Sequence, residues 1–495
     1  MDKNGVVTFG DWNKGQVKHP IYGFGLLQNV EVFENKGIAK LKNRFTPRTS
    51  ITPTATPIAE IYDVSGNTYT LTGETGSGAC YKNGVSIQSG LGLWGDLAIY
   101  KNYLWVRYST VLSAYGPLDS GGAQWFGNIV TGFNGNYIGK LLVGQDDYLY
   151  SGNGNFVTKM DVTSSGTPGV APTMSQIIAS AFTQLDLPDG QFVTTLKEYG
   201  TKIIVGTQGG ASYADRGNSS TARLYPWSRQ AGTLGNPGLA DLPVVFSENG
   251  VNALLQHANK LYVSAGTNGN IYVTDGTNYE KIATLPFAKT GVFSNSTVYV
   301  NAMDISEKGT LLVGLSGYAD GYSKAGVYEI DITNSEYPVA FRTISTLSTG
   351  TSSVLKIGFI HSTNFQTTNI GWSDGTTYGV DTSDFRMFSS YGGVIETPLV
   401  KVGQYNLKKT FEHIEFNLAE PLVTGQNLRV SYRKNSNEAY TVLNTWGFST
   451  LGAVISFEDI APIADCEYIQ LKIELDQSVA TLYGSNINLI SVRIW

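Results

Sequence analysis

Residues 252–276 read NALLQHANKLYVSAGTNGNIYVTDG, and this stretch decides the fold class. Apolar and polar residues alternate in 260–264 and in 270–274, as they do in strands with one buried face. The Asn-Gly pair at 268–269 is typical of a tight hairpin turn, and Asp275-Gly276 of a second one. The stretch predicts a meander of short strands at 253–255, 260–264 and 270–274, with a fourth at 280–283.

The same pattern recurs along the chain. Turn-forming residues precede apolar strands that contain Leu149, Ile203, Leu261 and Leu311, at steps of 54, 58 and 50 residues. Weaker copies lie near residues 100–105 and 370–375. Four-stranded propeller blades repeat at roughly 40–50 residues, and at longer steps where loops are inserted. We therefore expect an all-β chain built mainly as a β-propeller of about seven irregular blades, with six or eight left open.

Composition supports a turn-rich β protein. The 495 residues include 57 glycines and 12% aromatic residues, but only 15% are charged, against about a quarter in an average protein. The net charge of −6 and the lack of a long basic run argue against nucleic acid as a main partner. The chain is also too long for one ordinary core, which indicates more than one domain.

The pattern of polar, apolar and proline residues changes along the chain and indicates three parts. Residues 1–57 are expected to form an N-terminal arm and a proline-rich linker, and residues 58–395 the propeller. Clean alternation in 428–433 and 469–475 predicts half-buried antiparallel strands, so residues 396–495 are expected to form a C-terminal β-sandwich. Helical spacing is found only in 174–185, where we expect a helix.

Features that depend on the cellular compartment are few. The first residues are polar, and no run approaches the ~18 apolar residues of a membrane span. This predicts a protein made in a cytosol without membrane insertion. Cys80 and Cys466 lie far apart in the sequence, so buried free thiols are favoured over a disulfide.

No recognised catalytic motif is present in the sequence. The four histidines are isolated, and acidic pairs such as Asp146-Asp147 are better explained as turn acids than as calcium ligands. Asp275-Gly276 and Asp374-Gly375 resemble the Asp-box turns of sialidase-type propellers only faintly, and plain hairpin turns explain them better. These observations predict no enzyme, no catalytic residues, no metal site and no cofactor.

Aromatic residues in glycine-rich, loop-like stretches are the candidate binding residues. Such side chains bury large areas at interfaces and stack on sugar rings, although packing within the long loops explains them equally well. They are Trp125, Phe126, Tyr225, Trp227, Tyr318 and Tyr322.

The N-terminal residues carry a resemblance to a family. Tyr22-Gly23-Phe24-Gly25, then Val30-Glu31-Val32, then the segment 37–41, resemble the β-propeller type of virion protein in tailed bacteriophages, such as the tail nozzle and neck components. The order of arm, propeller and sandwich is similar over the whole chain.

The resemblance implies a structural component of the virion, in the tail, neck or tail tip. It implies a homo-oligomeric ring that contacts other virion proteins, with DNA at most passing through a channel, in a protein made in the host cytoplasm. The alternatives are a carbohydrate- or receptor-binding propeller and, less favoured, a glycan-processing enzyme with paired carboxylates.

Overall fold

The computed structural model of the chain describes residues 6–9, 26–28, 30–33, 38–41, 43–73, 78–92, 95–136, 139–164, 166–176, 185–209, 221–229, 240–285, 297–306, 308–318, 325–342, 354–363, 367–388, 392–402, 408–447, 449–451, 454–477 and 487–495. Within these ranges all regular structure is β, which confirms the predicted all-β class. Within the same ranges no helix is long and apolar enough to cross a membrane.

Most of the described chain forms seven small antiparallel units of four or five strands, which we call sheets 1 to 7. Further strand pairings join sheets 6 and 7 to each other and to C-terminal strands in one larger sheet. Sheet 1 consists of β6 (Pro57–Tyr62), β7 (Thr68–Thr72), β8 (Gly78–Lys82) and β9 (Val85–Leu91). Sheet 2 consists of β10 (Asp96–Tyr100), β11 (Tyr103–Tyr108), β12 (Val111–Gly116) and β13 (Gln124–Thr131). Sheet 3 consists of β14 (Leu141–Val143), β15 (Leu149–Asn153), β16 (Phe156–Ser164) and β17 (Thr173–Gln176), and β18 (Leu185–Asp186) also pairs with β16.

The remaining four sheets continue in chain order, except that an N-terminal strand completes the last one. Sheets 4 and 5 are β19 (Phe192–Tyr199), β20 (Lys202–Gln208), β21 (Ala222–Trp227) and β22 (Val244–Phe246), and β23 (Val251–His257), β24 (Lys260–Ala265), β25 (Asn270–Thr274) and β26 (Tyr279–Thr284). Sheets 6 and 7 are β27 (Thr297–Ile305), β28 (Leu311–Tyr318), β29 (Gly326–Ile330) and β30 (Val339–Arg342), and β31 (Val354–Ser362), β32 (Thr368–Ser373), β33 (Tyr378–Phe388) and β5 (Asn43–Pro47).

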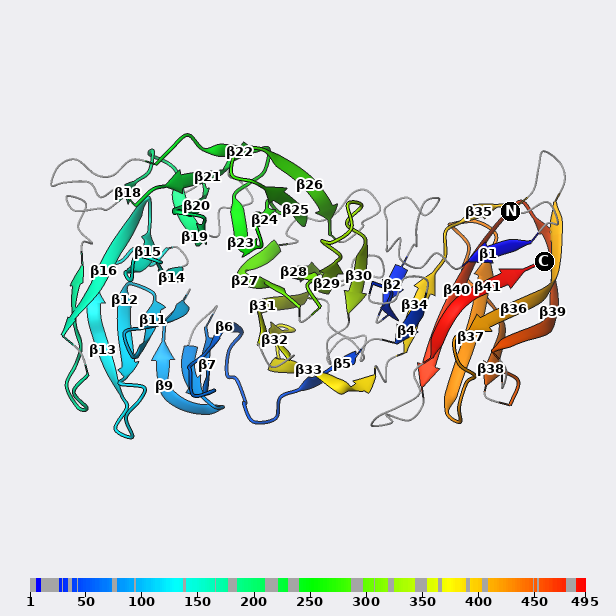
Figure 1. Cartoon of the computed structure of the whole chain (residues 1–495), viewed down its shortest axis with the longest axis horizontal. Coiled ribbons are helices and arrows are strands. Elements are labelled where there is room, and N and C mark those ends of the chain that lie inside the picture. The colour runs from blue at the N-terminus through cyan, green and yellow to red at the C-terminus, as the bar shows by residue number, and fades with distance from the viewer. Residues whose placement is uncertain are drawn as a thin grey trace.

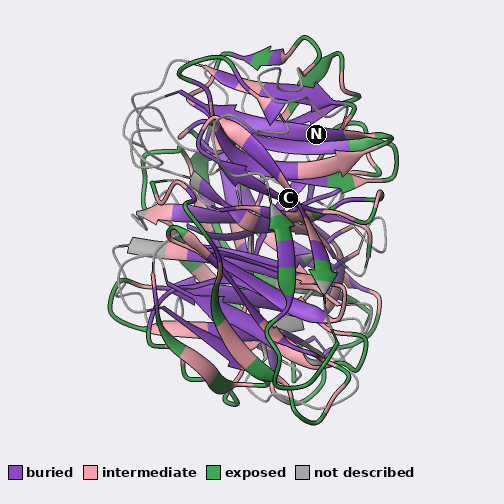
Figure 2. Cartoon of the chain, turned by 90° about the vertical axis from the view of Figure 1, so that its left-hand side faces the viewer, coloured by how far each residue is buried: buried purple, intermediate pink, exposed green. Residues whose placement is uncertain are grey.

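The sheets form a closed ring (Figure 1). The first strand of each sheet contacts the first strand of the next, and β31 of sheet 7 contacts β6 of sheet 1. Neighbouring sheets share buried cores: Ile204 and Leu224 of sheet 4, for example, pack with Leu261 and Val263 of sheet 5. Figure 2 shows the buried colour along many strands and the exposed colour mainly at turns and on some of the outer strands.

The repeated pattern in the sequence marks equivalent positions in this ring. Leu149, Ile203, Leu261 and Leu311 all lie on the second strand of their sheets, and each is fully buried. A second strand has a hydrogen-bonded neighbour on both sides and a sheet packed on each face, so an apolar residue is required there.

The C-terminal residues form two further sheets that share one core (Figure 1). Ile414 and Phe416 of one sheet pack in this core with Leu428 and Ile473 of the other. The first sheet consists of β1 (Val7–Phe9), β3 (Val30–Glu31), β4 (Ala39–Leu41), β41 (Asn488–Ile494), β36 (Lys409–Leu418) and β39 (Ile455–Cys466). The second consists of β38 (Thr441–Gly447), β37 (Gln426–Arg433), β40 (Tyr468–Gln477), β34 (Gly393–Glu396), β35 (Val400–Lys401) and β2 (Leu26–Gln28).

The N-terminal residues are shared between the ring and these two sheets. Strands β1, β2 and β4 pair with C-terminal strands, β3 pairs with β4, and β2 also pairs in parallel with β30 of sheet 6, through Gln28 and Phe341. Strand β5 pairs with β33, with Phe45 opposite Ser383, and so completes sheet 7 with an N-terminal strand. Within the described part of the expected arm, β1 to β5 are therefore strands of larger sheets, while residues 48–56 form an irregular connection to β6.

Two smaller expectations have different outcomes. The helix expected at 174–185 is wrong at both of its described ends, where Thr173–Gln176 and Leu185–Asp186 are strands that pair with β16; residues 177–184 lie outside the described part. Cys80 and Cys466 are both buried and free, as predicted. Burial raises the pKa of the Cys80 thiol to about 12.

Candidate functional site

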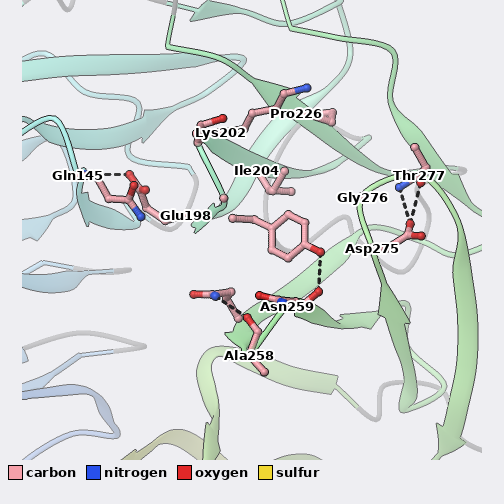
Figure 3. Close-up of a pocket in the computed structure, with 14 residues that line it drawn as sticks. Gln145, Glu198, Lys202, Ile204, Pro226, Ala258, Asn259, Asp275, Gly276 and Thr277 are labelled. Carbon is pink, nitrogen blue, oxygen red and sulfur yellow. Dashed lines mark hydrogen bonds between the residues drawn. The ribbon is translucent and has the colours of Figure 1, made fainter.

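A half-open pocket of about 590 Å³ lies where hairpin turns of sheets 3, 4 and 5 meet (Figure 3). We call it the turn pocket. Its lining comes from the β14–β15, β19–β20, β23–β24 and β25–β26 turns, above a floor formed by Ile204 and Pro226. These turns all lie on the same end of the ring, because each follows the first or the third strand of a four-stranded meander.

The turns are held by local backbone chemistry. Gly200 and Ala258 adopt positive φ angles of 59° and 49°, which tight turns between antiparallel strands require. In the β25–β26 turn, the Asp275 carboxylate accepts hydrogen bonds from the Asn278 and Thr277 amides, both at 2.9 Å. These bonds lower the pKa of Asp275 to about 2. The Asp275-Gly276 pair is therefore a hairpin turn, as the sequence indicated.

Tyr199 lines the pocket and connects two sheets. Its hydroxyl donates a hydrogen bond of 2.8 Å to the carbonyl oxygen of Asn259 in the next sheet, while its ring packs against the core between sheets 4 and 5. Gly276 adjoins this ring, since a Cβ at that position would lie 3.5 Å from Cε1 of Tyr199. The missing side chain keeps the aromatic ring open to the pocket.

An ionic cluster supports one wall of the pocket, which its member Glu198 lines. Arg229 is ion-paired with Glu198 and lies 3.9 Å from Asp146, while Lys159 is ion-paired with Asp146 at 3.0 Å. Glu198 also accepts a hydrogen bond of 3.0 Å from the backbone amide of Gln145. The side chains of Glu198 and Arg229 are each only 13% exposed, so this wall is rigid and its charges are paired.

The pKa values within this wall follow from its contacts. Burial alone raises the pKa of Asp146, but hydrogen bonds from Tyr150 and Lys159 outweigh burial and lower it. Burial and the same hydrogen bond to Asp146 raise the pKa of Tyr150. Asp146 therefore stays ionised near neutral pH, and its ion pair with Lys159 and its hydrogen bond from Tyr150 hold it in place.

The rim of the pocket carries uncharged polar groups. Gln145, Thr201, Asn259 and Thr277 are exposed, and within the described residues no hydrogen bond engages the side-chain amides of Gln145 and Asn259. Lys202 brings a cation to the rim, and it is ion-paired with Asp241 at 2.6 Å. The pocket thus presents two free side-chain amides and the Thr201 hydroxyl beside an aromatic ring, and its cations are already paired.

The aromatic residues expected to bind ligands lie elsewhere. Tyr225 and Trp227 belong to β21 and are 4% and 0% exposed, and Trp227 packs edge-on against Tyr150 at 5.8 Å between ring centroids. Their assignment as exposed stacking residues is wrong, because β21 is an inner part of sheet 4 rather than a loop. Trp125 and Phe126 are half-buried on β13, away from the turn pocket. The Tyr318 side chain and Tyr322 lie outside the described part.

The sequence identified the turns but not their convergence. Residues 199–201, 256–259 and 275–276 are all recognisable as turns, yet they are up to 77 residues apart along the chain. Their convergence could have been predicted from the positions of the turns within the repeats, because turns that follow equivalent strands of successive repeats must lie at the same end of a ring. Among the described residues no group of three or more His, Cys, Asp or Glu side chains is arranged to hold a metal ion.

Comparison with known proteins gives only distant similarity. No protein-family model and no curated protein matches the chain. Among solved structures it is similar to a glycoside hydrolase family 43 arabinoxylan arabinofuranohydrolase from Bacillus subtilis, with 12% identity, a TM-score of 0.30 and coverage of 91% of this chain and 97% of that one. It is also similar to a Trypanosoma rangeli sialidase, with 9% identity, a TM-score of 0.34 and coverage of 93% and 96%.

A third similar structure is a putative 6-phosphogluconolactonase from Bacteroides uniformis, with 12% identity, a TM-score of 0.35 and coverage of 57% of this chain and 85% of that one. Identities and TM-scores this low assign no activity to the chain. The prediction that the chain is not an enzyme is nevertheless wrong as stated. All three similar structures carry enzyme names, and the prediction depended only on the absence of familiar motifs.

Proposed function

We propose that this chain is a seven-bladed β-propeller with a C-terminal β-sandwich, and that it binds a neutral carbohydrate in the turn pocket. The architecture is supported by the closed ring of seven four-stranded sheets and by the shared core of the two terminal sheets. The observation that carries the function is the combination of an accessible aromatic ring, Tyr199, with exposed amides and hydroxyls around it.

The chemistry of the pocket suits a sugar. A pyranose ring offers an apolar C–H face to an aromatic ring and equatorial hydroxyls to amide groups, each of which both donates and accepts hydrogen bonds. The Asp275 carboxylate adds an acceptor that is ionised throughout the physiological range, because its pKa is lowered to about 2. A volume of about 590 Å³ lies within the range typical of small-ligand sites.

The charges of the pocket favour a neutral ligand over an acidic one. Arg229 is paired with Glu198, and Lys202 is paired with Asp241, so each of these cations already has a counter-charge. A carboxylate or sulfate on the sugar would have to displace one of these partners, and it would approach the Asp275 carboxylate. We therefore expect neutral oligosaccharides to bind more tightly than acidic ones.

The test is a glycan array followed by calorimetry, with matched variants. Gln145→Ala and Asn259→Ala each remove one free amide from the rim, and each should weaken binding by about threefold to tenfold, the value of one net hydrogen bond. Gln124→Ala removes an exposed amide from β13, remote from the pocket, and should leave affinity unchanged. Equal affinity in all three variants would contradict the proposal, as would binding of acidic glycans alone.

The same incubations decide whether the pocket also performs chemistry. Released reducing ends would make the turn pocket an active site, with Glu198 and Asp275 as the carboxylates to replace first. Bound glycan recovered intact would limit the pocket to binding.

Assembly into a virion ring with other virion proteins remains a separate prediction. Light scattering on the purified chain, alone and with virion lysate, tests it: closed rings would support it, and a monomer in both conditions would contradict it. Side chains from sheets 2, 3 and 6 meet at the centre of the single-chain ring, so any passage for DNA would have to lie between copies.

A further inference from the structure

Strand β39 forms one edge of the first C-terminal sheet, on the side of the C-terminal sheets away from the ring (Figure 1). It is 12 residues long, and in the described part of the chain its only strand partner is β36. Natural sheets protect such edges with devices such as prolines and bulges, because an open edge pairs readily with other strands. The two halves of β39 differ in this protection.

The second half, residues 460–466, is protected. Pro462 has no N–H group to offer to a further strand. The register with β36 shifts twice along this half, so the strand is irregular there. Lys434 also donates a hydrogen bond of 2.5 Å to the carbonyl oxygen of Ala464. These features leave no regular edge on which another strand can pair.

The first half, Ile455–Asp459, has neither a proline nor a register shift, and we call it the open edge. The Leu418 amide on β36 donates a hydrogen bond of 2.8 Å to the Val454 carbonyl oxygen, one residue before this half. Hydrogen-bonded and non-hydrogen-bonded positions alternate along an antiparallel pair. The N–H and C=O groups of Ile455 and Phe457 therefore point away from β36.

The same two residues present apolar side chains on the outer face of the sheet. Ile455 is 51% exposed and Phe457 is 64% exposed, whereas Ile414 and Phe416 on the inner face of β36 are buried in the core. The Phe457 ring packs edge-on against Trp495, with 6.0 Å between ring centroids. An added strand would gain backbone hydrogen bonds and contact with an aromatic ring that is already held in place.

The charge of the open edge decides which strand fits it. Residues 435–471 form both β38 and β39, and they contain five acidic residues but no lysine, arginine or histidine. Two of these acids, Glu458 and Asp459, lie in the open edge, and the Asp459 side chain is 92% exposed. Opposite charges in facing positions stabilise a strand pair, and like charges destabilise it. The open edge therefore favours a basic strand.

The basic side chains next to the open edge on the outer face already have partners. Arg493 is ion-paired with Glu415 at 3.2 Å. His413 Nδ1 lies 2.7 Å from Asp459 Oδ1, which leaves the other oxygen of this exposed carboxylate to an incoming cation. The sheet itself therefore does not neutralise the acidic edge.

We propose that the open edge of β39 binds an extended segment of a partner protein, which adds to the sheet as a further strand and carries lysine or arginine between apolar residues. Its apolar side chains contact Ile455 and Phe457, and its basic side chains pair with Glu458 and Asp459. A second copy of this chain is a poorer occupant, because its own β39 brings the same acids to the pair. The site is separate from the turn pocket and does not depend on carbohydrate binding.

The experiment uses the full chain and short fluorescent peptides as probes. One peptide alternates valine with lysine, a second alternates valine with glutamate, and a third is the lysine peptide with a central proline. Fluorescence anisotropy measures the dissociation constants. The constant of the lysine peptide should be at least about tenfold lower than those of the other two, because glutamate reverses the charge pairs and proline interrupts the ladder of hydrogen bonds.

Variants of the chain test the edge itself. Ile455→Pro removes an N–H group that β36 does not use, so it should abolish binding of the lysine peptide and leave the urea midpoint close to that of the wild type. Asp459→Asn should raise the dissociation constant about threefold through the loss of one charge pair. The matched control Glu280→Gln removes an exposed acid from β26, the edge strand of sheet 5, and should leave the affinity unchanged.

Hydrogen exchange measured by mass spectrometry locates the bound peptide. Saturating lysine peptide should slow exchange in Ile455–Asp459 and leave β26 unchanged. Absence of binding by the lysine peptide, equal binding of the lysine and glutamate peptides, unchanged affinity in both Ile455→Pro and Asp459→Asn, or slower exchange only at another edge would overturn the proposal. Slower exchange in Ile455–Asp459 of the free chain as its concentration rises would also overturn it, in favour of a second copy as the occupant.

Discussion

Replacing Asn301 with alanine tests whether the ring is closed across its centre. The Asn301 amide donates to Asp96 Oδ1 and to the Ile58 carbonyl oxygen, each at 3.0 Å, and its oxygen accepts from Lys140. The alanine variant leaves two oxygens without this donor. An unsatisfied buried polar group costs about 1–3 kcal/mol, and the low end applies because Asp96 keeps its contacts with Lys140 and the Leu141 amide. For two such oxygens we expect a loss of about 2 kcal/mol in the free energy of unfolding.

The assay is urea denaturation combined with hydrogen exchange measured by mass spectrometry. The exchange data assign the loss, because peptides covering β10 and β27 should lose protection while those of the C-terminal sheets keep it. Asn136→Ala, which replaces an exposed asparagine between β13 and β14, is the control and should change stability by less than about 0.5 kcal/mol. If Asn301→Ala matched this control in both measurements, the contacts across the axis would carry no stability and the argument would fail.

Three further predictions concern packing and titration. Trp227→Ala should lower the free energy of unfolding by about 3–5 kcal/mol, because it empties a fully buried site against Tyr150. Trp227→Phe should lower it clearly less. Equal, small losses in the two variants would contradict the buried placement of Trp227. The pKa of Asp275 is lowered to about 2 in the folded protein, from 3.8 in the unfolded chain. Asp275 therefore contributes to stability at pH values above 3.8, and this contribution is lost as the pH falls toward 2. An NMR titration midpoint of Asp275 near 3.8 would refute the turn geometry. Cys80 and Cys466 should resist a thiol reagent in the native protein and both react in urea; a fast-reacting thiol in the native state would contradict their burial.

Local signals in the sequence predicted local structure well. The meander expected at 253–283 is sheet 5, with strands at Val251–His257, Lys260–Ala265, Asn270–Thr274 and Tyr279–Thr284. Alternation and Asn-Gly or Asp-Gly turns determine such strands within a few residues, so no distant contact is needed to find them. The same reasoning places the buried leucines and isoleucines of the second strands.

Contacts between distant parts of the chain were not predictable in the same way. No local pattern shows that β1, β2 and β4 pair with C-terminal strands or that β5 completes sheet 7, because a strand partner hundreds of residues away leaves no mark on the strand itself. The prediction that Tyr225 and Trp227 are exposed binding residues failed for a related reason. Proline and glycine around Tyr225 and Trp227 suggested a loop, whereas pairing with β20 makes Ala222–Trp227 a buried strand.

The contacts across the centre of the ring illustrate the same limit. Asp96 and Asn301 each look like an isolated polar residue in an apolar strand, and they become neighbours only when the ring closes. The residues of the turn pocket are equally ordinary turn residues until sheets 4 and 5 pack together. Sequence repeats predict that such convergence exists, but the identity of the convergent side chains depends on the register of each sheet.

The most direct test of the account is hydrogen exchange on the full chain with and without a neutral oligosaccharide selected on the array. Binding in the turn pocket predicts slower exchange in the β19–β20, β23–β24 and β25–β26 turns, with no change at β13 or in the C-terminal sheets. Slower exchange confined to any other surface, or none at saturating ligand, would contradict the assignment of this pocket as the carbohydrate site.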